Sequence, residues 1–374
     1  MKQQSKVLKA LQLVSRTIHA FQAERGGLCM YLSDSSEANL ESYQVCVQNS
    51  DVLNKQICDL AESKLTLSHA VLAKSMAKIS RTLLNFVNQA PFRAATNTLD
   101  MSAGDALMVY THQLINHLVY LQVELVLAAK PQRSVEVSAL SNFIKWKDRI
   151  GRERALGAMG INMQQFDSEI FLQDFEMLLN EQQINKRTFL ALANEDQKNL
   201  FNHLYIEHIE IEAVHKQIAN AQAPNIKASF WFELLSQKIA MMHEMEQKFI
   251  SALFSNPVKS TTKAGAQLFK GEELEAVEDY LLFRGLSAKV KDKMFQSSNV
   301  KDYKKGSLLF LEGEQASRIY VVISGWVKIF KNSAEGTEKI EHMLTSGDVV
   351  IESSIFESSN YSNNAQVSVE GRLL

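Results

Sequence analysis

Three residue types are scarce in this chain of 374 residues, which contains three cysteines, four prolines and three tryptophans. Cys29, Cys46 and Cys58 are odd in number and lack the paired spacing of metal ligands. The sequence therefore predicts neither a disulfide framework nor a structural metal site. Thiols of this kind are reduced in the cytoplasm, which is where we expect the protein to be found.

The chain also lacks an excess of charge and a long apolar run. Its formal net charge is −2, so composition does not favour nucleic acid or anionic lipid as a partner. The most apolar stretch, residues 106–129, contains two histidines, two glutamines, an asparagine and a glutamate. That stretch predicts a buried bundle helix and no membrane association, and the N-terminus lacks the apolar block of a signal peptide.

Enzyme motifs are missing as well. The sequence contains no Gly-rich phosphate loop after a strand, no HExxH, no GxSxG and no CxxC. Glu212 and His215 form a single Glu-x-x-His, whereas a bundle di-metal centre needs this motif on two helices. We therefore expect no catalytic residues, no metal and no cofactor.

What is present is a chain with two periodicities. Residues 1–255 have the apolar period of amphipathic helices, broken at Pro91, Pro131 and Pro224, and seven or eight antiparallel helices fit this length. Residues 256–267 are small and polar and predict a flexible linker. Residues 268–374 contain short β-branched and aromatic runs punctuated by glycines, which predicts a small antiparallel β-roll.

The first helix has an arginine on its apolar face. Val7, Leu11, Val14, Ile18, Phe21, Arg25, Leu28 and Leu32 follow the helical period, and Arg25 is the only polar member. Gly26 and Gly27 follow it directly. Glycine costs roughly 0.5–1 kcal/mol in a helix interior, so this pair indicates that another backbone or a ligand comes close.

The same pattern recurs in "FIKWKDRIGRERALGAMGI", residues 143–161. Arg154 lies on the apolar face, Glu153 precedes it as Glu24 precedes Arg25, and small residues follow. A buried arginine needs an acceptor. The acceptor could be a carboxylate side chain on a neighbouring helix, which would make a structural salt bridge. Alternatively, both guanidinium groups could hold a small planar oxyanion as a ligand, such as nitrate, nitrite or a free carboxylate.

The segments "QAERGGLCMYLSDSS" and "WKDRIGRERALGAMG" resemble the paired motifs of the nitrate- and nitrite-sensing (NIT) domain. "VYTHQLINHL" and "WFELLSQKIAMMHEME" resemble further helices of that family in the right order. The resemblance covers nearly all of residues 1–255 and implies two antiparallel four-helix bundles that hold nitrate or nitrite through Arg25 and Arg154. Where the family has a further arginine, this chain has Lys216, which offers a point charge in place of a planar fork.

The C-terminal region resembles the cyclic-nucleotide-binding β-roll of the Crp/Fnr family, through "KKGSLLFLEGE", "YVVISGWVKIF" and "SGDV". The resemblance implies a nucleotide pocket after "SGDV". Glu352 matches that family's glutamate, but the position of its phosphate-binding arginine falls among Ser362, Asn363 and Asn364. Neutral amides cannot neutralise a phosphate, so we expect a vestigial pocket.

The chain ends where that family would complete its barrel and continue into a long helix and a DNA-binding motif. We therefore expect an incomplete β-roll whose last strands lack partners, and no DNA-reading element in this chain. Three functions follow. The first is a cytoplasmic sensor of nitrate or nitrite that acts through a homodimer or a protein partner. The alternatives are a cyclic-nucleotide receptor in which the helical half only dimerises, and an interaction scaffold in which both arginines form structural salt bridges.

Overall fold

The computed structural model describes residues 2–63, 70–93, 101–220, 222–255, 289–290, 293–294, 298–332, 338–350 and 359–374. It divides into two compact units, which are described separately below. One comprises Met1–Pro131, Leu140–Gln183 and Ala193–Asn256, and the other comprises Gln132–Ala139, Ile184–Leu192 and Pro257–Leu374. The predicted linker, residues 256–267, lies outside the described residues.

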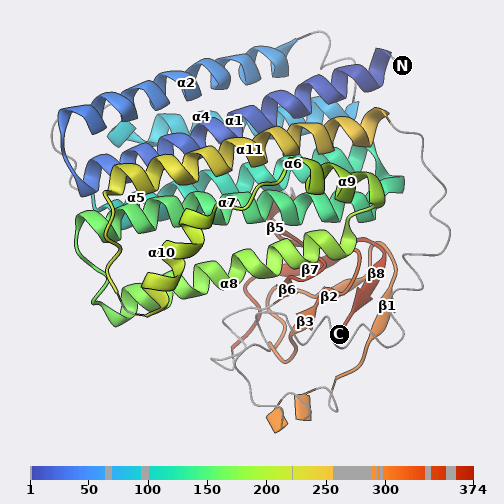
Figure 1. Ribbon diagram of the computed structural model, residues 1–374. Coiled ribbons are helices and arrows are strands. Elements are labelled where there is room, and N and C mark those ends of the chain that lie inside the picture. Colours follow the sequence, from blue (N-terminus) through green and yellow to red (C-terminus); the bar gives the residue numbers. More distant parts are fainter. Residues whose placement is uncertain are drawn as a thin grey trace. The chain divides into compact units, whose positions relative to one another are not determined.

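The first half of the helical region forms one bundle (Figure 1). Its elements are α1 (Lys2–Ser33), α2 (Glu37–Glu62), α4 (Ala70–Gln89), the short η1 (Pro91–Arg93), α5 (Ala103–Val109), η2 (Tyr110–Ile115) and α6 (Asn116–Ala129). Helix α1 packs against α2, α5 and α6, and α4 packs against α2 and α6. The elements α5, η2 and α6 follow one another without a break, so the predicted buried helix over residues 106–129 is confirmed.

The second half forms a second bundle. Its elements are η3 (Pro131–Arg133), α7 (Ser134–Asn162), α8 (Glu169–Leu192), α9 (Glu195–Leu204), α10 (Ile209–Ala219) and α11 (Ala228–Ser255). Edge-to-face contact between Phe143 and Phe249 joins α7 to α11, and Trp146 of α7 packs against Phe201 of α9. Helix α11 also packs against α1, which brings the two bundles together. The predicted mainly α fold of antiparallel bundles is confirmed.

A π-helical segment interrupts the long helix of the first bundle. Over Tyr110–Ile115 the hydrogen bonds shift from i−4 to i−5, and Asn116 N donates to Thr111 O. Such segments redirect the side chains that they carry and are frequent at functional sites. Here the segment turns Tyr110 and Thr111 toward α1, where they bond Glu24 and Arg25.

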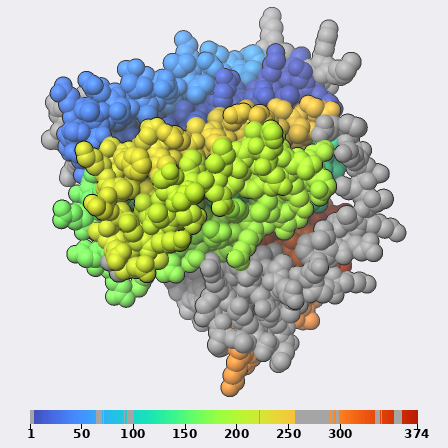
Figure 2. Space-filling model, viewed as in Figure 1, coloured from blue at the N-terminus to red at the C-terminus, as the bar shows by residue number. Residues whose placement is uncertain are grey.

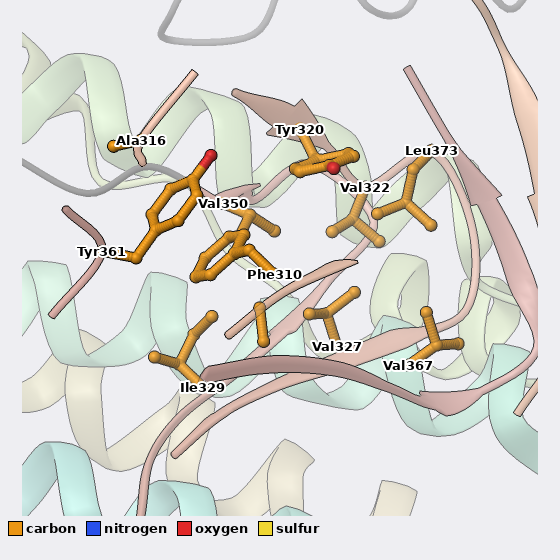
Figure 3. Packing of buried hydrophobic residues seen from close by; sticks show 11 residues of the cluster. Phe310, Ala316, Tyr320, Val322, Val327, Ile329, Val350, Tyr361, Val367 and Leu373 are labelled. Atoms are coloured by element: carbon orange, nitrogen blue, oxygen red, sulfur yellow. The ribbon is translucent and has the colours of Figure 1, made fainter. Parts of the chain in front are cut away.

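The described part of the C-terminal region is an antiparallel β-roll with the strands β1 (Lys301–Tyr303), β2 (Leu308–Phe310), β3 (Tyr320–Val321), β4 (Trp326–Asn332), β5 (Glu338–Thr345), β6 (Val349–Val350), β7 (Asn364–Val369) and β8 (Gly371–Leu373). The strand order in the largest sheet is β2-β7-β4-β5, and β1 pairs with β8 and β3 with β6. Phe310 stacks on Tyr361 in an apolar core that also contains Val327 and Val367 (Figure 3).

The expectation that the last strands lack partners is wrong. Strand β7 lies between β2 and β4, and β8 pairs with β1 along Lys301–Tyr303. Strands far apart in the sequence supply the partners, which the order of the elements along the chain does not reveal. Among the helices of the described residues, none is both long enough and apolar enough to cross a membrane.

Candidate functional site

Arg25 lies on α1 and is fully buried. Its Nη2 donates to Asp148 Oδ1 of α7 at 3.0 Å, and its Nη1 donates to Thr111 Oγ1 of the π segment at 2.9 Å. Arg152, one turn along α7, donates to the other oxygen of the same carboxylate at 3.2 Å. Arg25 therefore has the carboxylate on a neighbouring helix that the salt-bridge alternative requires.

Arg154 lies on α7 and is only 5% exposed, but its partners are all neutral. Nη1 donates to Ser236 Oγ at 2.8 Å, and Nη2 donates to the backbone oxygen of Gln22 at 3.1 Å. The guanidinium lies over the ring of Phe232, 4.3 Å from its centroid. Its Nε is buried without a hydrogen-bond partner, and no carboxylate in the described part of the chain pairs with it. Arg154 is thus a buried cation to which the described residues offer no paired carboxylate.

The two arginines cross between α1 and α7 in a reciprocal way. A Cβ atom at Gly26 of α1 would lie 2.4 Å from Arg154 Nη2, and one at Gly151 of α7 would lie 2.9 Å from Arg25 Nη2. Each guanidinium therefore occupies space that a glycine on the opposite helix leaves open. The prediction that another backbone comes close to the first glycine pair is confirmed at Gly27, where a Cβ atom would lie 3.4 Å from Tyr43 Cα of α2. At Gly26 the approaching group is neither a backbone nor a ligand but the side chain of Arg154.

The two glutamates that precede the arginines bind other partners. Glu24 accepts hydrogen bonds from Ser50, from Tyr110 and from Arg93, whose Nε lies 2.6 Å from its Oε1. Glu153 lies 2.6 Å from His215 Nε2 of α10 and accepts a hydrogen bond from Gln182 of α8. Adjacent positions on a helix point in different directions, so neither glutamate compensates the arginine beside it.

Arg154 lines a cavity of about 410 Å³ between α1, α2, α7 and α11. Three of these helices, α1 and α2 in blue and α11 in gold, form neighbouring bands of the surface in Figure 2. The polar lining includes His19, Asn39, Ser42, Cys46, Ser229 and Ser236, and the exposed Glu233 also lines the cavity. Neutral hydroxyl, amide and imidazole groups around one guanidinium form a site that suits a small anion.

The electrostatics of the two arginine sites differ. Burial favours a higher pKa for the Asp148 carboxyl, but the positive charges of Arg25 and Arg152 outweigh it and hold that pKa below its usual range. Burial, with repulsion from Arg25 as the next cause, lowers the pKa of Arg154 to about 10. Arg154 therefore remains charged at neutral pH, and the lowered pKa reflects the missing counter-charge.

A family model described as nitrate and nitrite sensing matches residues 16–253, well over half of the chain. The chain belongs to the nitrate- and nitrite-sensing (NIT) family. Over 267 residues it is 24% identical to the nitrate regulatory protein of Klebsiella oxytoca, a match that covers 70% of this chain and 64% of that protein. The structure of the NasR transcription antiterminator aligns with a TM-score of 0.58 and 22% identity, over 79% of this chain and 77% of that one, which supports the fold.

A second family model, described as a cyclic nucleotide-binding domain, matches residues 300–374 of this NIT protein. Over 91 residues the chain is 29% identical to the CRP-like cAMP-activated global transcriptional regulator of Mycobacterium tuberculosis, strain CDC 1551 / Oshkosh. That match covers 24% of this chain and 41% of the regulator. The chain thus spans less than two thirds of the length of either curated relative. The two curated relatives are named as regulators and the solved structure as a transcription antiterminator, and none of these three is named as an enzyme.

Lys216 does not lie at the cavity that Arg154 lines. It is an exposed residue of α10, and it is not among the residues that line the cavity. Its neighbour His215 is bound to Glu153 and packs against the buried Trp231. Arg25 does not line the cavity either, so of the three predicted anion-binding residues the structure brings Arg154 alone to it.

The two asparagines predicted at the vestigial nucleotide pocket have different environments. Asn364 is buried in β7, where Oδ1 accepts from Glu312 N at 3.0 Å and Nδ2 donates to Phe330 O at 3.1 Å. Both ends of this amide therefore hold backbone in place. Asn363 donates to the hydroxyl of Ser362 at 3.2 Å. Glu352 lies outside the described residues.

Several residues of the site were not predicted from the sequence. Asp148 and Gln22 lie between the two arginines, and His19, Ser236 and Phe232 come from the helices around the cavity. One signal was present for Gln22, which precedes Arg25 by three positions and so lies on the same face of α1. Among the described residues no group of three or more His, Cys, Asp or Glu side chains is arranged to hold a metal ion.

Proposed function

We propose that this chain is a non-enzymatic regulatory protein that senses nitrate or nitrite in the cavity beside Arg154. The observation that carries this proposal is a buried guanidinium that lines a cavity and has no carboxylate partner in the part of the chain that the structure describes. Family membership supports the identity of the anion. A planar oxyanion can accept from the free N–H groups of the planar guanidinium fork, and these charge-assisted bonds are stronger than bonds between neutral groups.

Within this proposal the two arginines have different roles. Arg154 contacts the anion, whereas Arg25 ties α1 to α7 and the π segment through Asp148 and Thr111. The bound anion can act as a signal only if it favours one arrangement of the helices over another. Arg154 of α7 and polar groups of α1, α2 and α11 would all contact the bound anion. The resulting change in the arrangement of these helices would pass to the β-roll. The homodimer and the protein partner for the output stay predictions.

Calorimetric titration of the full chain with sodium nitrate and sodium nitrite tests this proposal, with chloride at equal ionic strength as the reference. We expect saturable heat with one or both oxyanions. In Arg154→Leu the loss of charged hydrogen bonds of about 1.5–3 kcal/mol should weaken binding roughly 10- to 150-fold. Arg81→Gln removes an exposed arginine of α4, which does not line the cavity, and should bind like the wild type.

A titration with cyclic AMP separates the alternative in which the β-roll is the receptor. The match to a cyclic nucleotide-binding domain is the observation that favours this alternative. The burial of Asn364 opposes it, and so do the hydrogen bonds that its amide oxygen and nitrogen both make to backbone. Heat with cyclic AMP and none with either oxyanion would refute the anion sensor, and no heat with any of them would favour the scaffold.

A further inference from the structure

The charge difference between the two arginine sites originates in one pair of residues at the crossing of α1 and α7. Gln22 Nε2 donates to Asp148 Oδ1 at 2.9 Å, and both side chains are buried. These two residues also supply the backbone acceptors of the arginines. Arg154 Nη2 lies 3.1 Å from Gln22 O, and Arg25 Nη2 lies 3.5 Å from Asp148 O.

Gln22 and Asp148 therefore play corresponding parts at the crossing of α1 and α7. Each offers its backbone oxygen to the arginine of the opposite helix, and that arginine lies against a glycine of the helix that offers the oxygen. The side chains break the correspondence, because Asp148 is a carboxylate and Gln22 is a neutral amide. Two guanidinium groups share the Asp148 carboxylate, whereas the third, that of Arg154, pairs with no carboxylate among the described residues.

We propose that Gln22 is the specificity-determining residue of this site: because its side chain is a neutral amide, Arg154 keeps an uncompensated charge to which a monovalent anion can bind. This inference rests on the proposed sensing function and adds a residue that lies beside the cavity without lining it. A carboxylate at position 22 would act as an internal anion for Arg154. The new carboxylate would also face the Asp148 carboxylate. The three positive charges of Arg25, Arg152 and Arg154 would then be compensated by two negative charges, whereas the wild type has one.

The test uses the full chain and four variants: Gln22→Glu, Gln22→Met, Asp148→Asn and the double exchange Gln22→Glu/Asp148→Asn. Nitrate titration should show at least 10-fold weaker binding in Gln22→Glu and in the double exchange. The double exchange moves the carboxylate from position 148 to position 22 without changing the total charge of the cluster. It therefore shows whether the position of the carboxylate or the total charge determines nitrate binding. Gln22→Met is the matched neutral control and should bind within about threefold of the wild type. Asp148→Asn is the parent of the double exchange, and the effect of the Gln22→Glu change in that background is measured relative to it.

Unchanged nitrate binding in Gln22→Glu would overturn the inference, and so would a loss in Gln22→Met as large as the loss in Gln22→Glu. A second readout needs no nitrate. Because the introduced carboxylate would compensate Arg154, Gln22→Glu should unfold at a higher urea concentration than Gln22→Met in low salt. Failure of that ordering overturns the inference on its own. If the ordering holds and the wild type binds neither oxyanion, the sensing function is refuted while the role of Gln22 in the charge of the cavity stands.

Discussion

Arg25 and Arg154 lie in similar sequence motifs, in which a glutamate precedes the arginine and small residues follow it, and their neighbours in space give them different chemistry. Arg25 is fully buried and bonded to the Asp148 carboxylate, so it resembles the salt bridge that the scaffold alternative expects for both. Arg154 is buried against Phe232, Ser236 and a backbone oxygen. The first therefore contributes to stability, and the second is available to a ligand.

Replacement by leucine should separate these two roles. Arg25→Leu removes one of the two arginines that pair with the buried Asp148 carboxylate, and breaking a buried pair typically costs about 3–5 kcal/mol. Arg154→Leu removes an uncompensated buried charge and should cost clearly less than Arg25→Leu, or even stabilise the chain. Urea unfolding in low salt measures both free energies of unfolding. Equal and large losses in the two variants would instead favour a structural role for both arginines.

At the scale of the elements, glycines decide how closely the helices approach. Helix α7 carries Gly151 and Gly157, and a Cβ at the latter would lie 2.3 Å from Trp231 Nε1 of α11. Trp231 is fully buried and its Nε1 lies 3.4 Å from Glu153 O, so the indole is fixed in place. The small residues after Arg154 thus let α11 pack directly on α7 at the turn of helix that carries the cavity arginine.

Gly157→Ala tests this contact. The added methyl group must displace a rigid, buried indole, and such overpacking typically costs about 1–3 kcal/mol. Gly104→Ala in α5 is the matched control, since its Cβ would meet only Ser102 Oγ, at 3.7 Å. There we expect a neutral effect or a gain of about 0.5–1 kcal/mol from helix propensity. Thermal unfolding of both variants measures the difference, and a Gly157→Ala chain as stable as the control would contradict the packing described here.

At the scale of the whole molecule, the helical region contains titratable groups whose pKa values are lower in the folded chain than in the unfolded chain. These groups therefore bind fewer protons when the chain is folded. His19 of α1 and His243 of α11 stack with ring centroids 4.1 Å apart. Burial, with the nearby Lys147 charge as the next cause, lowers their pKa values from 6.5 to about 2 and about 3. Burial favours a higher pKa for the Glu153 carboxyl, but its interaction with His215 outweighs burial and holds that pKa below its usual range.

Lowering the pH should therefore destabilise the protein at pH values well above the ordinary pKa of a carboxyl group. Between about pH 3 and pH 6.5 the two histidines bind protons only when the chain is unfolded, so stability falls as the pH drops below about 6.5. Each contributes a slope of about 1.4 kcal/mol per pH unit. His243→Phe keeps the stacked aromatic pair and should reduce the slope by about that amount in urea unfolding at pH 4–6. An unchanged slope would show that His243 is protonated in the folded state.

The sequence by itself determined the class of the protein. Helical periodicity, three helix-breaking prolines and short glycine-punctuated runs predict helical bundles and a β-roll, because these patterns are local and each element buries one face. The paired motifs likewise point to the NIT family and to Arg25 and Arg154. Only the tertiary structure decided which arginine is paired, since Asp148 lies 123 positions from Arg25 and meets it only where α1 crosses α7. The same crossing places the neutral Gln22 opposite Asp148, and charge compensation depends on such contacts through space, which no local pattern encodes.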